Sequence, residues 1–124
     1  MLYVEDFKQV CDAKTRIASL EKEISSLKKF NLDNEEIAST KAIMLEIEML
    51  EYKVAILYGK VEEVVCFIKD CDDIIVSQAI EERFLKGKSW LQVAHTLGGS
   101  NTPESARKIV ERYFKKKGIG RKEI

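Results

Sequence analysis

The chain has 124 residues, with 21 basic and 21 acidic side chains and 45% hydrophobic residues. This hydrophobic share excludes a disordered chain, because disordered chains lack the apolar surface that forms a core. Six glycines and one proline are too few for collagen-like chains or for all-β folds with many turns. No apolar run reaches the roughly 18 residues of a membrane-spanning helix, and the N-terminus carries acids where a signal peptide carries bases. We therefore expect an all-α, cytoplasmic protein with no membrane partner.

Cysteine and histidine are too few for the common metal sites. The cysteines are Cys11, Cys66 and Cys71, and His95 is the only histidine. An odd cysteine count without a secretion signal argues against a disulfide framework, and the spacing of Cys66 and Cys71 does not match a zinc half-site. We predict that the cysteines are small buried hydrophobic residues. We expect no metal, no other cofactor and no small-molecule ligand.

An enzyme is not expected. A single histidine leaves no pair of nucleophile and base, and no glycine-rich phosphate-binding loop is present.

The zero net charge hides a strong asymmetry. Residues 1–82 hold 10 basic and 18 acidic side chains, whereas residues 83–124 hold 11 basic and 3 acidic ones. This split indicates a basic module that meets a polyanion, beside an acidic module with another role. The alternative is a pair of self-neutralising surfaces, or a basic tail that is simply solvated.

The acidic half carries two runs of apolar residues at alternating spacings of three and four, which is typical of coiled-coil helices. The first run predicts a helix over about 3–29 and consists of Val10, Ala13, Ile17, Leu20, Ile24 and Leu27. The second run covers nearly five heptads and consists of Ile43, Ile47, Leu50, Val54, Leu57, Val61, Val64, Ile68, Cys71 and Ile75.

The link between the two runs, residues 30–36, is short. Asp33 with Glu36 predicts an N-cap and its capping partner, and Asn34 is the alternative cap. Helices joined by so short a link are antiparallel neighbours. We therefore predict that residues 1–73 form an acidic helical hairpin.

Apolar residues outside the seam, among them Met44, Met49, Tyr52, Ile56, Tyr58, Val65 and Phe67, predict that the hairpin also forms a homo-oligomer. The residues assigned to oligomerisation are Val10, Ile17, Leu20, Ile24, Leu27, Ile47, Leu50, Val54, Leu57, Val61, Val64 and Ile68.

The aspartates at 70, 72 and 73 predict a helix end and a new N-cap. A fresh helix over about 74–86 then points five apolar side chains inward: Ile75, Val76, Ala79, Ile80 and Phe84. A continuous helix through to Lys86 is the alternative.

The basic part has the spacing of a helix-turn-helix within residues 74–124. Gly87 ends one helix, and Ser89 with Gln92 forms a capping pair for a short helix over 90–97. Gly98 and Gly99 begin a turn, after which Thr102 caps a last helix that starts at Pro103 and runs to about 117. A short helix, a glycine turn and a basic helix are the parts of a DNA-binding helix-turn-helix.

Double-stranded DNA is therefore the expected partner. Recognition helices read bases with side chains near their N-terminal half, whereas helix N-termini and lysines contact phosphates. The candidate DNA-binding residues are Lys88, Ser89, Asn101, Thr102, Glu104, Ser105, Arg107, Lys108, Arg112 and Lys115, with Lys116, Lys117, Arg121 and Lys122 adding salt-dependent affinity.

Residues 80–98, IEERFLKGKSWLQVAHTLG, resemble the RY-x-x-G-x-SW-x-x-IA-x-x-LG signature of sigma-factor-like helix-turn-helix proteins. With the preceding heptads, nearly the whole chain is similar to the phage and prophage transcriptional regulators of the ArpU/RinA-like type. The resemblance implies a regulator that reads a promoter element in a bacterial or phage-infected cell, with RNA polymerase as a further candidate partner. The turn over 98–103 is longer than in that family.

Two other functions compete with this interpretation. One is a phage DNA-packaging or assembly component, because small terminase subunits also combine a helix-turn-helix with oligomerising helices. The other is an interaction protein whose helix-turn-helix does not bind DNA.

Overall fold

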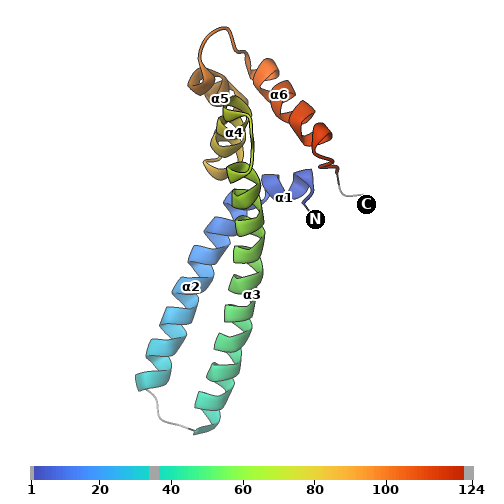
Figure 1. Cartoon of the computed structure of the whole chain (residues 1–124). Coiled ribbons are helices and arrows are strands. Elements are labelled where there is room, and N and C mark those ends of the chain that lie inside the picture. Colours follow the sequence, from blue (N-terminus) through green and yellow to red (C-terminus); the bar gives the residue numbers. More distant parts are fainter. Residues whose placement is uncertain (1, 34–36, 122–124) are drawn as a thin grey trace. The chain divides into compact units, whose positions relative to one another are not determined.

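The computed structural model describes residues 2–33 and 37–121, without the side chains of residues 31–33 and 37–39. The described residues form helices and their connections, with no strand among them, which confirms the all-α class. The elements are α1 (Val4–Lys8), α2 (Val10–Asp33), α3 (Ile37–Lys69), α4 (Ile74–Ile80), the π-helical turn η1 (Glu81–Leu85), α5 (Trp90–Leu97) and α6 (Pro103–Lys116) (Figure 1).

The chain divides into two compact units. One contains Met1–Cys11 and Glu62–Ile124, and the other contains Asp12–Val61. We call them the terminal unit and the central unit, and α3 contributes residues to both. This division differs from the boundary expected after residue 73, because the first eleven residues and the last part of α3 pack with the C-terminal helices.

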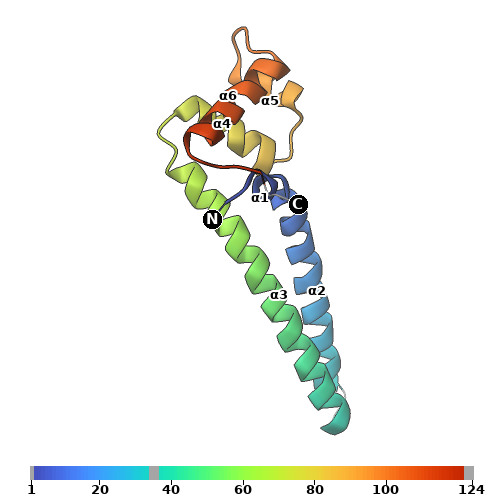
Figure 2. The same ribbon diagram turned by 90° about the vertical axis from the view of Figure 1, so that its right-hand side faces the viewer.

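The central unit is held together by an apolar seam between α2 and α3, which run side by side in opposite directions (Figure 2). Ile24, Ile47 and Leu50 form its buried cluster, against which Leu20, Leu27, Ile43 and Val54 pack as partly buried neighbours. These residues all belong to the spacing of three and four in the sequence. Six of these seven residues, all but Ile43, belong to the set that the sequence assigns to oligomerisation.

Polar contacts border this seam. Tyr58 Oη donates a hydrogen bond of 3.0 Å to Glu21 Oε1, and Lys28 Nζ lies 3.3 Å from Glu51 Oε1. Both contacts are exposed and contribute little to stability. The buried apolar side chains are therefore the main source of cohesion in the central unit.

The N-terminal helix differs from its prediction. The single helix expected over 3–29 is divided at Gln9 into α1 and α2, and α2 continues to Asp33. The predicted caps at Asp33 and Asn34, with Glu36 as the capping partner, lie outside the residues whose side chains are described. Cys66 is exposed and Cys11 and Cys71 are half-buried, so the prediction that the cysteines are buried is wrong.

The core of the terminal unit is a cluster of four phenylalanines, Phe7, Phe67, Phe84 and Phe114. Phe7 of α1 is fully buried, and its ring centroid lies 5.2 Å from Phe67, 5.8 Å from Phe84 and 4.6 Å from Phe114. Edge-on and tilted rings at such separations attract one another beyond their loss of exposed area. This phenylalanine cluster joins α1, α3, η1 and α6.

The break between α3 and α4 is confirmed. The Asp73 side chain caps α4, because its Oδ1 accepts hydrogen bonds from the backbone N–H groups of Ile75 at 3.0 Å and Val76 at 3.2 Å. Val76, Ala79 and Ile80 are buried as predicted. Ile75 is 54% exposed, so its predicted inward position is wrong. The heptad pattern stops with α3, and Ile75 lies on the solvent side of the new helix.

Two glycine substitutions of equal size should have opposite effects on stability. Gly59 lies inside α3, whereas Gly98 ends α5 with a φ of +73°. At both positions a new Cβ atom would have no neighbouring atom within 4 Å. We expect Gly59→Ala to raise the free energy of unfolding by about 1 kcal/mol, because alanine favours helix. Gly98→Ala should lower it by about 1–2 kcal/mol, because alanine resists positive φ. Urea denaturation of both variants measures this, and equal signs would contradict it.

Candidate nucleic-acid interface

α5 begins where the sequence predicts. The Ser89 hydroxyl accepts a hydrogen bond of 3.2 Å from the Gln92 backbone N–H, and Gln92 Oε1 accepts one of 3.0 Å from the Ser89 N–H. This reciprocal capping confirms the predicted pair. Val93 and Ala94 are buried, and α5 packs mainly against α6.

The turn between α5 and α6 depends on two glycines with positive φ, +73° at Gly98 and +63° at Gly99. Asn101 fastens the turn, because its Nδ2 donates a hydrogen bond of 2.9 Å to the Gly98 carbonyl. Its side chain is therefore engaged in holding the turn.

α6 starts with a second reciprocal cap. Thr102 Oγ1 accepts a hydrogen bond of 3.1 Å from the Ser105 N–H, and the Ser105 hydroxyl accepts one of 2.8 Å from the Thr102 N–H. Pro103 is the first helical residue, as predicted. Ser105 was a candidate for base contact, but its half-buried hydroxyl is occupied by the cap and by neighbouring acceptors.

One face of α6 is buried and the other carries charges. Ala106, Val110, Tyr113 and Phe114 are buried against the terminal unit. Ile109 is half-buried. The exposed side chains of α6 include Glu104, Arg107, Lys108, Glu111, Arg112, Lys115 and Lys116.

Two of the candidate cations on α6 are paired with glutamates of the same helix. Arg107 lies 3.8 Å from Glu104 and 3.6 Å from Glu111, and Lys108 lies 3.5 Å from Glu104. These contacts are exposed, so a phosphate can replace them at little cost. Among the described residues no carboxylate forms an ion pair with Arg112.

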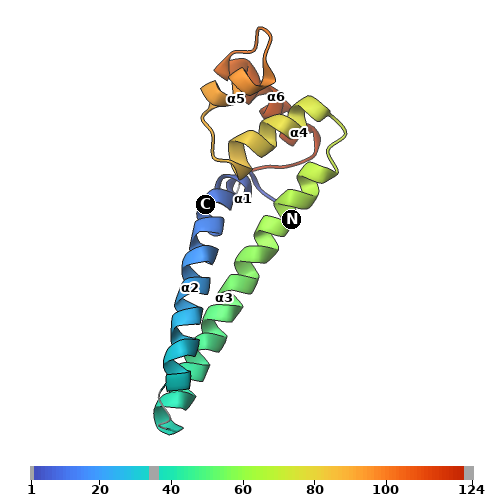
Figure 3. The ribbon, with the colours of Figure 1, turned by 90° about the vertical axis from the view of Figure 1, so that its left-hand side faces the viewer.

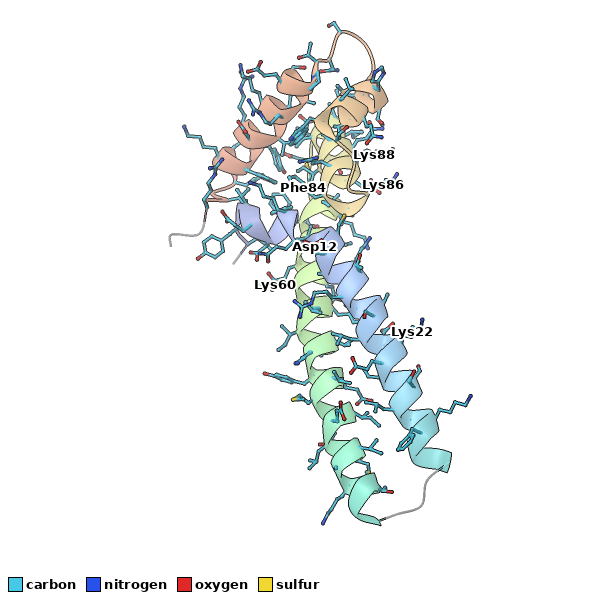
Figure 4. All side chains as sticks on the ribbon, turned by 180° about the vertical axis from the view of Figure 1, so that it is seen from behind. Asp12, Lys22, Lys60, Phe84, Lys86 and Lys88 are labelled. Atoms are coloured by element: carbon cyan, nitrogen blue, oxygen red, sulfur yellow. The ribbon has the colours of Figure 1, made fainter. Side chains whose placement is uncertain are left out.

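Lys88 has a structural partner. The buried carboxylate of Glu82 accepts a hydrogen bond of 2.8 Å from Lys86 Nζ and forms an ion pair with Lys88 Nζ. Figure 4 shows the Lys86 and Lys88 side chains close to one another. Hydrogen bonds from Lys86 and then Lys88 hold the pKa of Glu82 below its ordinary value, and the Glu82 carboxylate raises the pKa of Lys86. Lys88 therefore stabilises the turn before α5.

A basic pocket of about 480 Å³ lies in the terminal unit beside α6. Phe84, Trp90 and Phe114 contribute aromatic surface to it. Its charged lining residues are Lys8, Arg83, Arg107, Glu111, Lys115 and Arg121. Five cations and one carboxylate make this pocket a place where a phosphate group is attracted.

Arg83 is held rigidly at this pocket. Its Nη1 donates a hydrogen bond of 2.8 Å to the Lys88 carbonyl, and its guanidinium lies 5.0 Å from the centre of a Trp90 ring. Trp90 in turn packs edge-on against Phe84 at 6.2 Å. The half-buried Trp90 side chain thus supports the Arg83 guanidinium.

Lys8 and Arg83 are not among the DNA-binding cations expected from the sequence. Lys8 lies in the acidic half, and no spacing rule connects it with α6. It reaches the pocket because its neighbour Phe7 is buried in the phenylalanine cluster. Only contacts between residues distant in the sequence reveal this placement.

Other kinds of site receive no support in the described part of the chain. No group of three or more His, Cys, Asp or Glu side chains is arranged there to hold a metal ion. None of its helices has the length and apolar character needed to cross a lipid bilayer. Comparison with known proteins found no matching family model, no similar curated protein and no similar solved structure.

The Glu82 contacts predict a specific pH dependence. A folded-state pKa below the ordinary 4.5 means that stability is present above that value and is lost as the pH falls through the lowered pKa. We expect Glu82→Gln to lower the free energy of unfolding at pH 7 by about 1 kcal/mol, a small value because both ammonium groups are partly exposed. The variant and wild type should converge only as the pH falls through the lowered pKa of Glu82.

Urea denaturation at several pH values measures this effect. Glu81→Gln is the matched control, because Glu81 is the exposed neighbour of Glu82. A similar loss in both variants would show that the Glu82 contacts have no special role.

Proposed function

We propose that the protein is a sequence-specific DNA-binding transcription regulator of phage or prophage origin, and not an enzyme. In this proposal α2 and α3 form an acidic hairpin, and α4, α5 and α6 form a sigma-factor-like helix-turn-helix. α6 is the recognition helix that reads a promoter element.

The observation that carries the proposal is the two-sided character of α6. Its apolar face is buried against the terminal unit, and its exposed face concentrates cations after a rigid glycine turn and a capped N-terminus. A helix that enters the major groove needs this arrangement, because one face must be anchored while the other meets bases and phosphates. The resemblance of residues 80–98 to the sigma-factor-like signature supports the same assignment.

The cations of α6 divide into two groups in this proposal. Lys108 and Arg112 lie four residues apart and do not line the basic pocket, and they suit contact with base edges and nearby phosphates. Arg107 and Lys115 line the basic pocket with Lys8 and Arg83, where they suit a phosphate of the DNA backbone. In this proposal the cations of the pocket supply affinity for DNA, and Lys108 and Arg112 supply the recognition of its sequence.

Removing cations from α6 should weaken DNA binding. For Lys108→Ala combined with Arg112→Ala, we expect about tenfold weaker binding to duplex DNA near 100 mM salt, and a salt dependence lower by about one to two released counterions. Fluorescence anisotropy with a labelled duplex at several salt concentrations measures both quantities.

The matched control is Lys14→Ala combined with Lys22→Ala, which removes the same charge from exposed positions of α2 in the central unit. This control should bind as the wild type does. If the α6 variant loses less than twofold affinity while keeping its helical circular dichroism, α6 is not the DNA-reading helix. An equal loss in both pairs would indicate a general charge effect instead.

A further inference from the structure

α3 carries a second apolar stripe besides the one that packs against α2. Leu45, Met49, Tyr52 and Ile56 follow spacings of four, three and four residues, and their exposed fractions are 65%, 53%, 68% and 51%. We call these four residues the outer stripe. Large apolar side chains gathered on one exposed helix face indicate a binding surface more than scattered ones do.

The outer stripe lies away from α2. Viewed down the axis of α3, at about 100° per residue, the four side chains of the outer stripe fall within an arc of roughly 60°. The centre of this arc lies roughly 140° around the helix from the centre of the seam residues. Ile47 and Leu50 of that seam are buried against α2, which runs along one side of α3 in the central unit (Figure 3). The outer stripe therefore needs a partner other than α2.

We infer that the outer stripe binds the same stripe of a second copy of this chain, as a parallel, in-register, two-stranded coiled coil. The alternating spacing is the one that lets two helices interlock their side chains along a seam. The inference concerns the central unit and is independent of the proposed DNA binding.

The charges that border the outer stripe favour a second copy in this orientation. In a parallel coiled coil, the residue just before the first seam position of a heptad (position g) lies beside a residue of the partner chain. That partner residue is five positions later in the sequence (position e of the next heptad). Lys41 then meets Glu46 of the second copy, and Glu48 meets Lys53 of the second copy. The two-fold symmetry forms each pair twice. All four residues are exposed, and among the described residues none of them forms an ion pair within its own chain.

This interface differs from the one expected from the sequence. The residues assigned there to oligomerisation include Ile24, Ile47 and Leu50, which are buried between α2 and α3 of one chain. They cannot meet a second copy without opening that seam. The outer stripe offers an interface that leaves the seam intact.

Sedimentation of the full chain tests the inference. We expect wild type at roughly 50 μM to show twice the chain mass of 14.2 kDa, and Met49→Glu with Tyr52→Glu to weaken the dimer roughly tenfold to a hundredfold. Met44→Glu is the matched control and should remain dimeric, because Met44 is equally exposed on α3 but lies outside the outer stripe. A wild-type monomer, a larger ring, or a dimer unaffected by the double substitution would overturn the inference.

Cross-linking tests the orientation. Tyr52→Cys in a Cys66→Ser background should give a disulfide-linked dimer on mild oxidation, because residue 52 faces its own copy in a parallel, in-register pair. Met44→Cys in the same background should stay uncrosslinked. A dimer by sedimentation that forms no Tyr52→Cys crosslink would overturn the parallel register.

Discussion

The terminal unit depends on the burial of Phe7 among the rings of Phe67, Phe84 and Phe114. Burying such a ring stabilises the fold by about 2–3 kcal/mol before ring–ring attraction is added. Two further contacts fix the same N-terminal segment: the Val4 N–H donates to the Gly120 carbonyl at 2.9 Å, and Cys11 Sγ donates to the Phe84 carbonyl at 3.1 Å. The first residues of the chain are thus part of the terminal unit. Because Phe114 belongs to α6, this packing also determines which face of α6 stays exposed.

Local chemistry and long-range packing act together on α6. Capping at Ser89 and Thr102 sets where α5 and α6 begin, and the glycine turn lets the chain reverse between them. The phenylalanine cluster then anchors the apolar face of α6. The exposed cations that remain, on α6 and around the basic pocket, are the surface to which we assign DNA binding. Glu82 has a supporting part, because it forms ion pairs with Lys86 and Lys88 and stabilises the turn that leads into α5.

Features that depend on local spacing were predictable from the sequence. The caps at Ser89 and Thr102 were predicted correctly, and so were the bounds of α5 and the seam of the central unit, whereas the cap of α4 was assigned only to the group Asp70, Asp72 and Asp73. Each follows from residues within one or two helical turns of one another. The place of Phe7, the presence of Lys8 and Arg83 at the basic pocket and the exposure of Ile75 and Cys66 were not predictable, because they depend on contacts between distant segments. From the sequence, the outer stripe could be recognised only as apolar residues in excess of one seam. Both apolar stripes of α3 have spacings of three and four, so the spacing does not predict which of them packs against α2.

The most direct test of the account is binding of the wild-type full chain to random-sequence duplex DNA over a range of salt concentrations, followed by sequencing of the bound pool. The account predicts affinity that falls steeply with salt, together with an enriched sequence, because phosphate contacts supply affinity and α6 supplies base contacts. Binding without any enriched sequence would contradict a promoter-reading role. An absence of binding even at low salt would contradict the assignment of the basic surface to DNA.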